Sequence, residues 1–209
     1  MRFIDISQDT KNNYRLEKNE KVVFFLLNRD GKLDFEMAGE NAEAHIFAFA
    51  IGHGETKQKL EINQKHLAPR TTSSALVKAA LKDEAEFSYE GLIHIGKKAL
   101  LSDASQESRS LLLSPLAKAS TKPALEILAD DVACSHKATV SPVSKEALFF
   151  VESRGLSRKQ ATELLVSGFM KSSFDEMKEL TSSINNKRIK NLESRITEEI
   201  QSVLSSVHA

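Results

Sequence analysis

Short apolar segments recur between residues 21 and 140, and they constrain the fold of this chain more than any other feature. They follow one another at intervals of about 10 to 14 residues, a spacing typical of strands joined by turns. In several of them apolar residues alternate with polar ones, as at Leu33, Phe35 and Met37, which is the pattern of a half-buried strand. No helical periodicity interrupts the series, so we predict an all-β stack.

The expected strand segments are residues 21–27, 33–37, 47–51, 60–62, 75–80, 85–89, 92–95, 111–113, 125–128 and 132–140. Coils of such strands can stack into a solenoid, in which each coil covers its neighbours and one continuous core is buried. The segments show no fixed-length repeat. The pattern by itself therefore leaves a β-sandwich as the competing architecture.

The period of the pattern changes after Pro142. Ser144 is a favourable N-cap for a first helix, and Ser157 is a favourable N-cap for a second. A third helix is expected at about residues 187–205, after a linker at residues 179–186 that is rich in Ser and Asn. The C-terminal part of the chain is therefore predicted to be helical.

The length of 209 residues suits one domain, or one domain with a small appendage. We predict a β core over residues 1–143 and a helical region over residues 144–209. The 29 basic and 29 acidic residues cancel, so nothing indicates a nucleic-acid or membrane surface. A single cysteine can form no internal disulfide, and the N-terminal residues hold no apolar signal segment. These features lead us to expect a soluble, cytoplasmic protein.

The one cysteine, Cys134, is followed two residues later by His136 within an expected strand. Their side chains would share one face of that strand, with α carbons roughly 6.6 Å apart. A thiolate and an imidazole at that separation can bind one soft metal ion or the edge of an iron–sulfur cluster. The spacing equally fits a cysteine packed as a small hydrophobe beside a surface histidine. The other candidates, His45, His53 and His94, have no recognised ligand spacing and are expected to be surface or locally hydrogen-bonded residues.

Several segments resemble one known family. The run from Thr121 to Val140, which contains LEI, ADDV, CSH and AT elements, closely resembles the SufB/SufD scaffold proteins of the SUF system of iron–sulfur cluster assembly. Residues 148–169 resemble the start of the C-terminal helical region in the same family. Residues 66–74 look like its H-x-x-P-x-T-x-S segment, and residues 87–106 are similar to the rung that follows.

This resemblance implies a mainly β fold, a right-handed parallel β-helix followed by a small α-helical region. It also implies a non-catalytic scaffold subunit, which pairs edge to edge and carries a transient iron–sulfur cluster at the interface without a permanently bound cofactor. Cys134 and His136 match the interface residues, and a cysteine two residues before the histidine favours the SufD-like branch. A nearby cation or metal is expected to lower the thiol pKa toward the thiolate form. His66 and Pro69 match positions that we interpret as structural, at the corner of a rung.

The same resemblance implies that the C-terminal helices dock an ABC-type ATPase subunit (SufC-like). The candidate docking residues are Phe149, Phe150, Arg154, Gly155, Leu164, Leu165, Gly168 and Phe169. The other expected partner is a second scaffold chain, which is either a SufB-like subunit or another copy of this chain. The sequence leaves that choice open.

Three departures from the family pattern bear on these expectations. Lys137 stands where the family often has Gly, the N-terminal helical domain is missing or much reduced, and the second cysteine of the SufB-type partner has no counterpart. One thiolate per copy means that a cluster needs ligands from a partner chain. Two other functions stay open, a structural β-solenoid binding module without a cluster role and an enzyme in which His136 activates Cys134 as a nucleophile.

Overall fold

The computed structural model describes residues 1–181 and 186–205 as eleven β-strands followed by three α-helices. The strands are β1 (Arg2–Asp5), β2 (Asn13–Leu16), β3 (Lys21–Leu27), β4 (Gly31–Met37), β5 (Glu43–Gly52), β6 (Lys57–His66), β7 (Thr72–Leu81), β8 (Glu86–Ile95), β9 (Asp103–Leu112), β10 (Lys118–Ile127) and β11 (Ala133–Pro142). The helices are α1 (Lys145–Glu152), α2 (Arg158–Leu180) and α3 (Asn186–Ser205).

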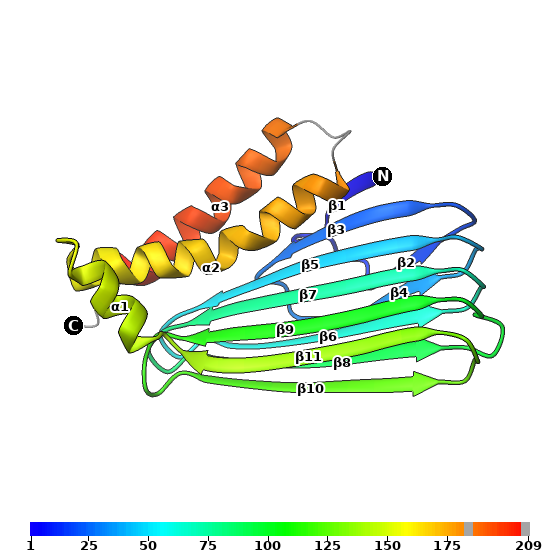
Figure 1. Cartoon of the computed structure of the whole chain (residues 1–209), viewed down its shortest axis with the longest axis horizontal. Coiled ribbons are helices and arrows are strands. Elements are labelled where there is room, and N and C mark those ends of the chain that lie inside the picture. The colour runs from blue at the N-terminus through cyan, green and yellow to red at the C-terminus, as the bar shows by residue number, and fades with distance from the viewer. Residues whose placement is uncertain (182–185, 206–209) are drawn as a thin grey trace.

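Consecutive strands alternate between two sheets, so that the chain winds as a flattened coil (Figure 1). Sheet A has the order β1-β3-β5-β7-β9-β11, and sheet B has the order β10-β8-β6-β4-β2. Each neighbouring pair of strands is parallel. This arrangement confirms the expected right-handed parallel β-helix with C-terminal helices, and it excludes the β-sandwich, whose sheets are antiparallel.

The strands are longer and more regular than the apolar segments indicated. β5 to β11 each contain ten residues, and the expected segments at 85–89 and 92–95 are two halves of β8. Gly91 joins these halves inside the solenoid, where an added Cβ would lie 2.1 Å from Oε1 of Gln106 and 2.6 Å from the hydroxyl of Tyr89. A side chain at this position would require Gln106 and Tyr89 to move, and the glycine interrupts the apolar pattern of the strand.

Each coil has a corner of the same backbone conformation, but a different type of residue occupies that corner in each coil. Asn41, Arg70, Leu101 and Asp131 each have a φ between 55° and 58°, at the turn that leads from sheet B to sheet A. The N–H of Arg70 donates to the carbonyl oxygen of Leu100 at 2.8 Å, which joins one corner to the next. Four different residue types occupy this conformation, and this explains why no repeat is visible in the sequence.

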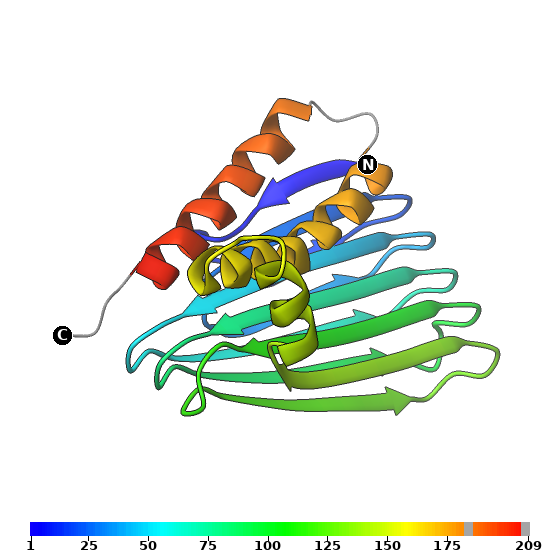
Figure 2. The same cartoon turned by 60° about the vertical axis from the view of Figure 1, so that its left-hand side comes forward.

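Helices α2 and α3 cover the outer face of sheet A over its first strands (Figure 2). One apolar cluster unites Phe25 of β3 and Phe49 of β5 with Phe174 of α2 and Ile196 of α3. The rings of Phe49 and Phe174 stack with centroids 5.5 Å apart. Because β3 is buried on both faces after Lys21, residues 22–27 form a continuous apolar run instead of an alternating one.

A buried lysine also ties α2 to sheet A. Lys78 of β7 donates to the carbonyl oxygen of Phe169 at 2.5 Å and to the hydroxyl of Ser172 at 2.7 Å. Burial lowers the pKa of Lys78 to about 8. The expected third helix corresponds to α3. The expected linker at 179–186 overlaps the ends of α2 and α3, and residues 182–185 lie outside the described part of the chain.

Candidate functional site

The last coil of the solenoid, formed by β10 and β11, ends both sheets. Each of these strands has a neighbour on one side, and in the described part of the chain no strand pairs with its other edge. In the other coils, one row of side chains on each strand faces the interior of the solenoid. In the last coil no further coil covers this inward row, and Leu125 is 39%, Ile127 43% and Val140 43% exposed. The C-terminal end therefore presents two strand edges of ten residues beside an exposed apolar row.

The N-terminal end of the solenoid is built differently. Its edge strands β1 and β2 have four residues each. Arg29 donates to the carbonyl oxygen of Ile6 at 2.5 Å and to the hydroxyl of Tyr14 at 2.9 Å, and Tyr14 donates to Asp9 at 3.0 Å. Short edges beside a hydrogen-bonded loop are poor templates for strand pairing. Of the two ends, the C-terminal one thus offers the longer edges.

Cys134 and His136 lie two residues apart on β11 and share one face of the strand. Their register partners on β9 are Ala104 and Gln106, which are both buried in the solenoid interior. Cys134 is half-buried, and it packs against an apolar cluster that includes Ile95 and Ala104. His136 is exposed. The thiol and the imidazole therefore belong to the inward row of the uncovered last coil.

The surroundings of Cys134 act against ionisation of its thiol. Burial, together with the nearby carboxylate of Asp103, raises the pKa of Cys134 above its ordinary value. This direction is opposite to the lowering that a cation or metal would cause. Lys137 does not supply that cation, because it lies on the outward row of β11, in register with Glu107 of β9. A bound metal would have to supply the stabilisation that a ligand thiolate needs.

The candidate docking residues divide into an exposed group and a packed group. Phe149 is 72% exposed, Phe150 57% and Leu164 55%, and the guanidinium of Arg154 lies 3.4 Å from the centroid of the Phe150 ring. Gly155, with a φ of 90°, makes the turn between α1 and α2. α1 thus carries an exposed aromatic pair on the first turns after the solenoid.

The remaining candidates lie along α2. Leu165 and Phe169 are partly buried, and Phe169 packs against the apolar cluster beneath α2 with Lys78 4.9 Å from its ring centroid. Gly168 is exposed, and no heavy atom lies within 4 Å of the position of an added Cβ. Phe169 therefore contributes to the attachment of α2 to the solenoid.

His66 and Pro69 lie where β6 turns into β7. Nδ1 of His66 is 2.7 Å from the hydroxyl of Thr71, and Nε2 is 2.8 Å from the hydroxyl of Ser73. Burial lowers the pKa of His66 to about 4, so its ring is neutral at neutral pH. The carbonyl oxygen of Pro69 accepts the N–H of Asn41 from the preceding coil.

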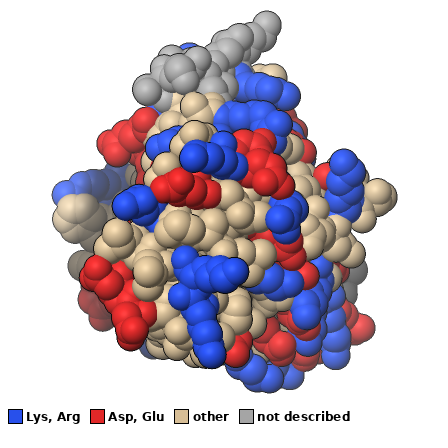
Figure 3. Space-filling model, turned by 90° about the vertical axis from the view of Figure 1, so that its right-hand side faces the viewer, with Lys and Arg blue, Asp and Glu red and all other residues tan. Residues whose placement is uncertain are grey.

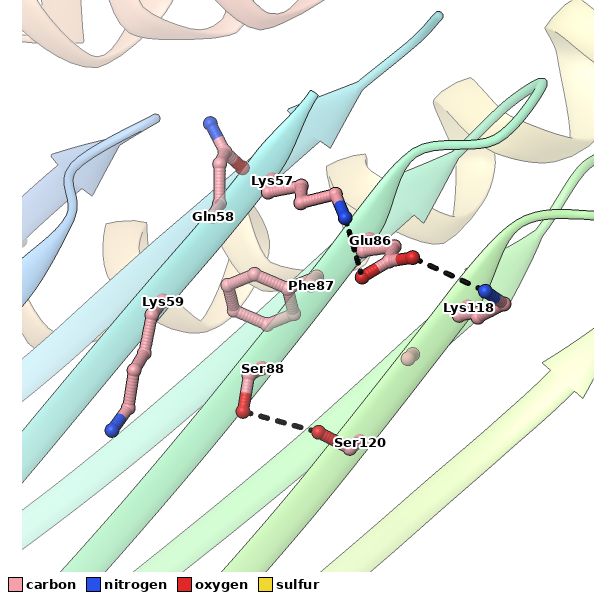
Figure 4. Close-up of a pocket in the computed structure, with 9 residues that line it drawn as sticks. Lys57, Gln58, Lys59, Glu86, Phe87, Ser88, Lys118 and Ser120 are labelled. Carbon is pink, nitrogen blue, oxygen red and sulfur yellow. Dashed lines mark hydrogen bonds and ion pairs between the residues drawn. The ribbon is translucent and has the colours of Figure 1, made fainter. Parts of the chain in front are cut away.

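The outer face of sheet B holds a shallow hollow of about 520 Å³ at the starts of β6, β8 and β10 (Figure 4). Glu86 lies between Lys57 at 3.7 Å and Lys118 at 3.2 Å, and Ser120 donates to Ser88 at 3.1 Å. These polar groups satisfy one another across the strands. The charged groups form a ladder across the strands, and among the described residues Oε1 of Gln58, which also lines the hollow, is buried without a hydrogen-bond partner.

Figure 3 shows the end of the molecule that lies at the right in Figure 1. Positive and negative side chains are interspersed over this surface. Within residues 1–181 and 186–205, no group of three or more His, Cys, Asp and Glu side chains is placed to hold a metal ion. None of the described helices combines the length and the apolar character needed to cross a membrane.

A protein-family model matches this chain over most of the solenoid. Residues 27–169 match the model described as "SUF system FeS cluster assembly, SufBD core domain". The chain belongs to the SufBD family. The matched region runs from the end of β3 into α2, and it contains both the Cys134–His136 strand and the aromatic pair of α1.

Individual relatives cover shorter or longer parts of the chain. The iron–sulfur cluster assembly protein SufB of Bacillus subtilis is 34% identical over 134 residues, which is 64% of this chain and 29% of the relative. A SufBD family protein of Staphylococcus saprophyticus is 30% identical over 182 residues, 81% of this chain and 39% of the relative. One from Mycobacterium tuberculosis is 34% identical over 134 residues, 16% of its length. The chain thus spans well under half the length of these relatives. Its assignment to the SufD-like branch of the family stays a prediction.

Proposed function

We propose that this SufBD family member is a non-catalytic scaffold subunit of the SUF machinery, working in the cytoplasm. It pairs through the last coil of its solenoid and docks an ABC-type ATPase through its C-terminal helices. The observation that carries this proposal is the asymmetry between the two ends of the solenoid. Two long strand edges, an exposed apolar row and the Cys134–His136 pair all occur at the C-terminal end.

Pairing through this end follows from the energetics of strand edges. A second chain that adds strands beside β10 and β11 would satisfy the free backbone groups of both edges. It would also cover Leu125, Ile127 and Val140, which are each about two-fifths exposed in the single chain. The partner is a second scaffold chain, either SufB-like or another copy of this one. In the second case a two-fold axis brings two copies of Cys134 and His136 to one interface.

The proposed cargo of that interface is a transient iron–sulfur cluster. The chain has one cysteine, so the remaining cluster ligands come from the partner. Cluster binding would reverse the effect of burial on Cys134, because a bound metal stabilises the thiolate over the thiol. Release of the cluster to an acceptor is favoured for the same reason, because the Cys134 thiolate then regains a proton and becomes a thiol. This balance suits a scaffold that passes its cargo on.

Edge pairing is tested by placing two positive charges in the exposed inward row. The variant Ala138→Lys with Val140→Lys puts two charges into the proposed contact, and we expect at least a tenfold weaker association of the scaffold pair. Sedimentation velocity measures association of the chain alone and with a SufB-like subunit. Thr139→Lys, on the outward row of the same strand, is the matched control and should pair normally. Unchanged association of the double variant would refute edge pairing.

ATPase docking is tested on α1. Phe149→Ser and Phe150→Ser each remove an exposed aromatic side chain, and a buried aromatic anchor is typically worth 2 kcal/mol or more at an interface. We therefore expect each variant to bind the ATPase subunit about 30-fold more weakly in calorimetric titration. Leu116→Ser, 61% exposed at the turn before β10, is the control for loss of an exposed apolar side chain. Full affinity in both phenylalanine variants would exclude α1 as the docking element.

A further inference from the structure

A cluster of three hydrogen-bonded side chains, separate from Cys134, lies on the outer face of sheet A. His45 of β5 is 9% exposed and lies between a carboxylate and a hydroxyl. Its Nε2 is 2.8 Å from Oε1 of Glu43, and its Nδ1 is 2.7 Å from the hydroxyl oxygen of Ser74 on β7. His45 and Ser74 are register partners on adjacent strands, so the ladder itself holds the contact. A hydroxyl, an imidazole and a carboxylate thus form one hydrogen-bonded line.

The direction of the hydrogen bonds follows from the charges. Glu43 also pairs with Lys21 at 2.5 Å, and the hydrogen bonds from Lys21 and His45 outweigh burial and lower the pKa of Glu43. The carboxylate is therefore ionised and accepts a hydrogen bond from Nε2–H of His45. In the neutral ring Nδ1 is then the acceptor, and it receives the Ser74 O–H. This is the arrangement of an activated serine with a base and an orienting acid, with the two ring nitrogens exchanged relative to the usual order.

Ser74 opens onto a small cavity of about 130 Å³ between sheet A and α2. Ser105 of β9, Ser135 and Lys137 of β11 and Glu176 of α2 also line it. Ser74, Ser105 and Ser135 occupy one row across the three strands. Within the described residues, the side chains of Ser105, Ser135 and Lys137 make no hydrogen bond or ion pair. Ser105 is the register partner of Ser74 on the adjacent strand, so its hydroxyl is the donor placed to stabilise a developing oxyanion.

We propose that, separately from the scaffold role, in which the chain is non-catalytic, Ser74, His45 and Glu43 form a hydrolytic site for small activated acyl esters. Ser74 Oγ bonds to the ester carbonyl carbon while its proton passes to Nδ1 of His45. The bond to the alcohol oxygen then breaks, and the alcohol leaves with that proton. Water hydrolyses the acyl-serine with the same histidine as base, which yields the carboxylic acid and restores the serine. The cavity is small, about 130 Å³, so we expect short acyl groups such as acetyl to be the preferred substrates.

The site is tested on the purified full chain with a fluorophosphonate probe and with p-nitrophenyl acetate. Peptide mass spectrometry should place the probe on Ser74, and Ser74→Ala should remove it. His45→Gln should slow labelling and ester hydrolysis by a factor of about 100 or more, the usual contribution of a general base. The matched control is His94→Gln, because His94 lies 2.9 Å from Glu126 in a similar pair.

Two results would overturn the proposal. One is wild-type protein that takes up no probe, and the other is equal labelling of Ser74→Ala. If His45→Gln lowers the melting temperature, Glu43→Gln provides a second variant, since it removes the orienting charge while keeping the size of the side chain. Equal labelling of wild type, His45→Gln and Glu43→Gln would show that the histidine is purely structural, and it would also contradict the proposal.

Discussion

Replacing Cys134 with serine is expected to reduce iron and sulfide loading of the reconstituted scaffold to background. Cys134 is the only thiol that this chain offers, and a serine hydroxyl does not bind a soft metal as a thiolate does. The side chain is half-buried and the change is nearly isosteric, so we expect stability to change by less than about 1 kcal/mol. Loading is measured by iron and sulfide analysis after anaerobic reconstitution with the scaffold partner and the ATPase.

His136→Ala is the companion variant, and it should reduce loading in part, because it removes an exposed imidazole and leaves the thiol. His94→Gln is the control for loss of a histidine on the outer surface. Edge pairing should persist in the Cys134 and His136 variants, because Leu125, Ile127 and Val140, the large apolar side chains of the exposed inward row, remain in place. Unchanged loading in both variants would reject their assigned role, while loss of pairing would indicate a structural one.

Stability is expected to fall as the pH is lowered from about 6.5 toward 4, because of His66. Its pKa is about 4 in the folded chain and about 6.5 in an unfolded one, so below pH 6.5 the unfolded chain binds a proton that the folded chain does not. The stabilisation is therefore complete above pH 6.5, and it is lost as the pH approaches 4. The gap between the two pKa values corresponds to on the order of 3 kcal/mol.

Urea unfolding at several pH values from 7.5 to 4.5 measures this loss. His66→Gln is the matched variant, because an amide can keep contacts to Thr71 and Ser73 but takes up no proton. We expect the difference in unfolding free energy between wild type and variant to shrink by about 2 to 3 kcal/mol over this range. Carboxylates with lowered pKa values, such as Asp34 and Glu43, affect both proteins equally. Parallel pH curves for the two proteins would contradict the role of His66.

The strand segments that were predicted well are those with an apolar inward row. Leu33, Phe35 and Met37 alternate because burial on one face of a strand selects every second residue. The first eight residues of β9 carried no such signal. Its inward row includes Gln106, Ser108 and Ser110, which are buried although they are polar. Apolar periodicity does not report a strand whose interior is polar, and this is why the solenoid was only partly visible.

Sequence alone was sufficient for an all-β core, a helical tail and a thiol two residues from an imidazole, because each depends on residues close together in the chain. The contact between Ser74 and His45 depends instead on residues that are far apart in the chain. These residues are 29 positions apart, and they meet because one coil brings β7 beside β5 in a particular register. The corners that precede these two strands hold Asn41 and Arg70, which share a backbone conformation and no common side chain. Which side chains become neighbours across coils was thus decided by the tertiary structure.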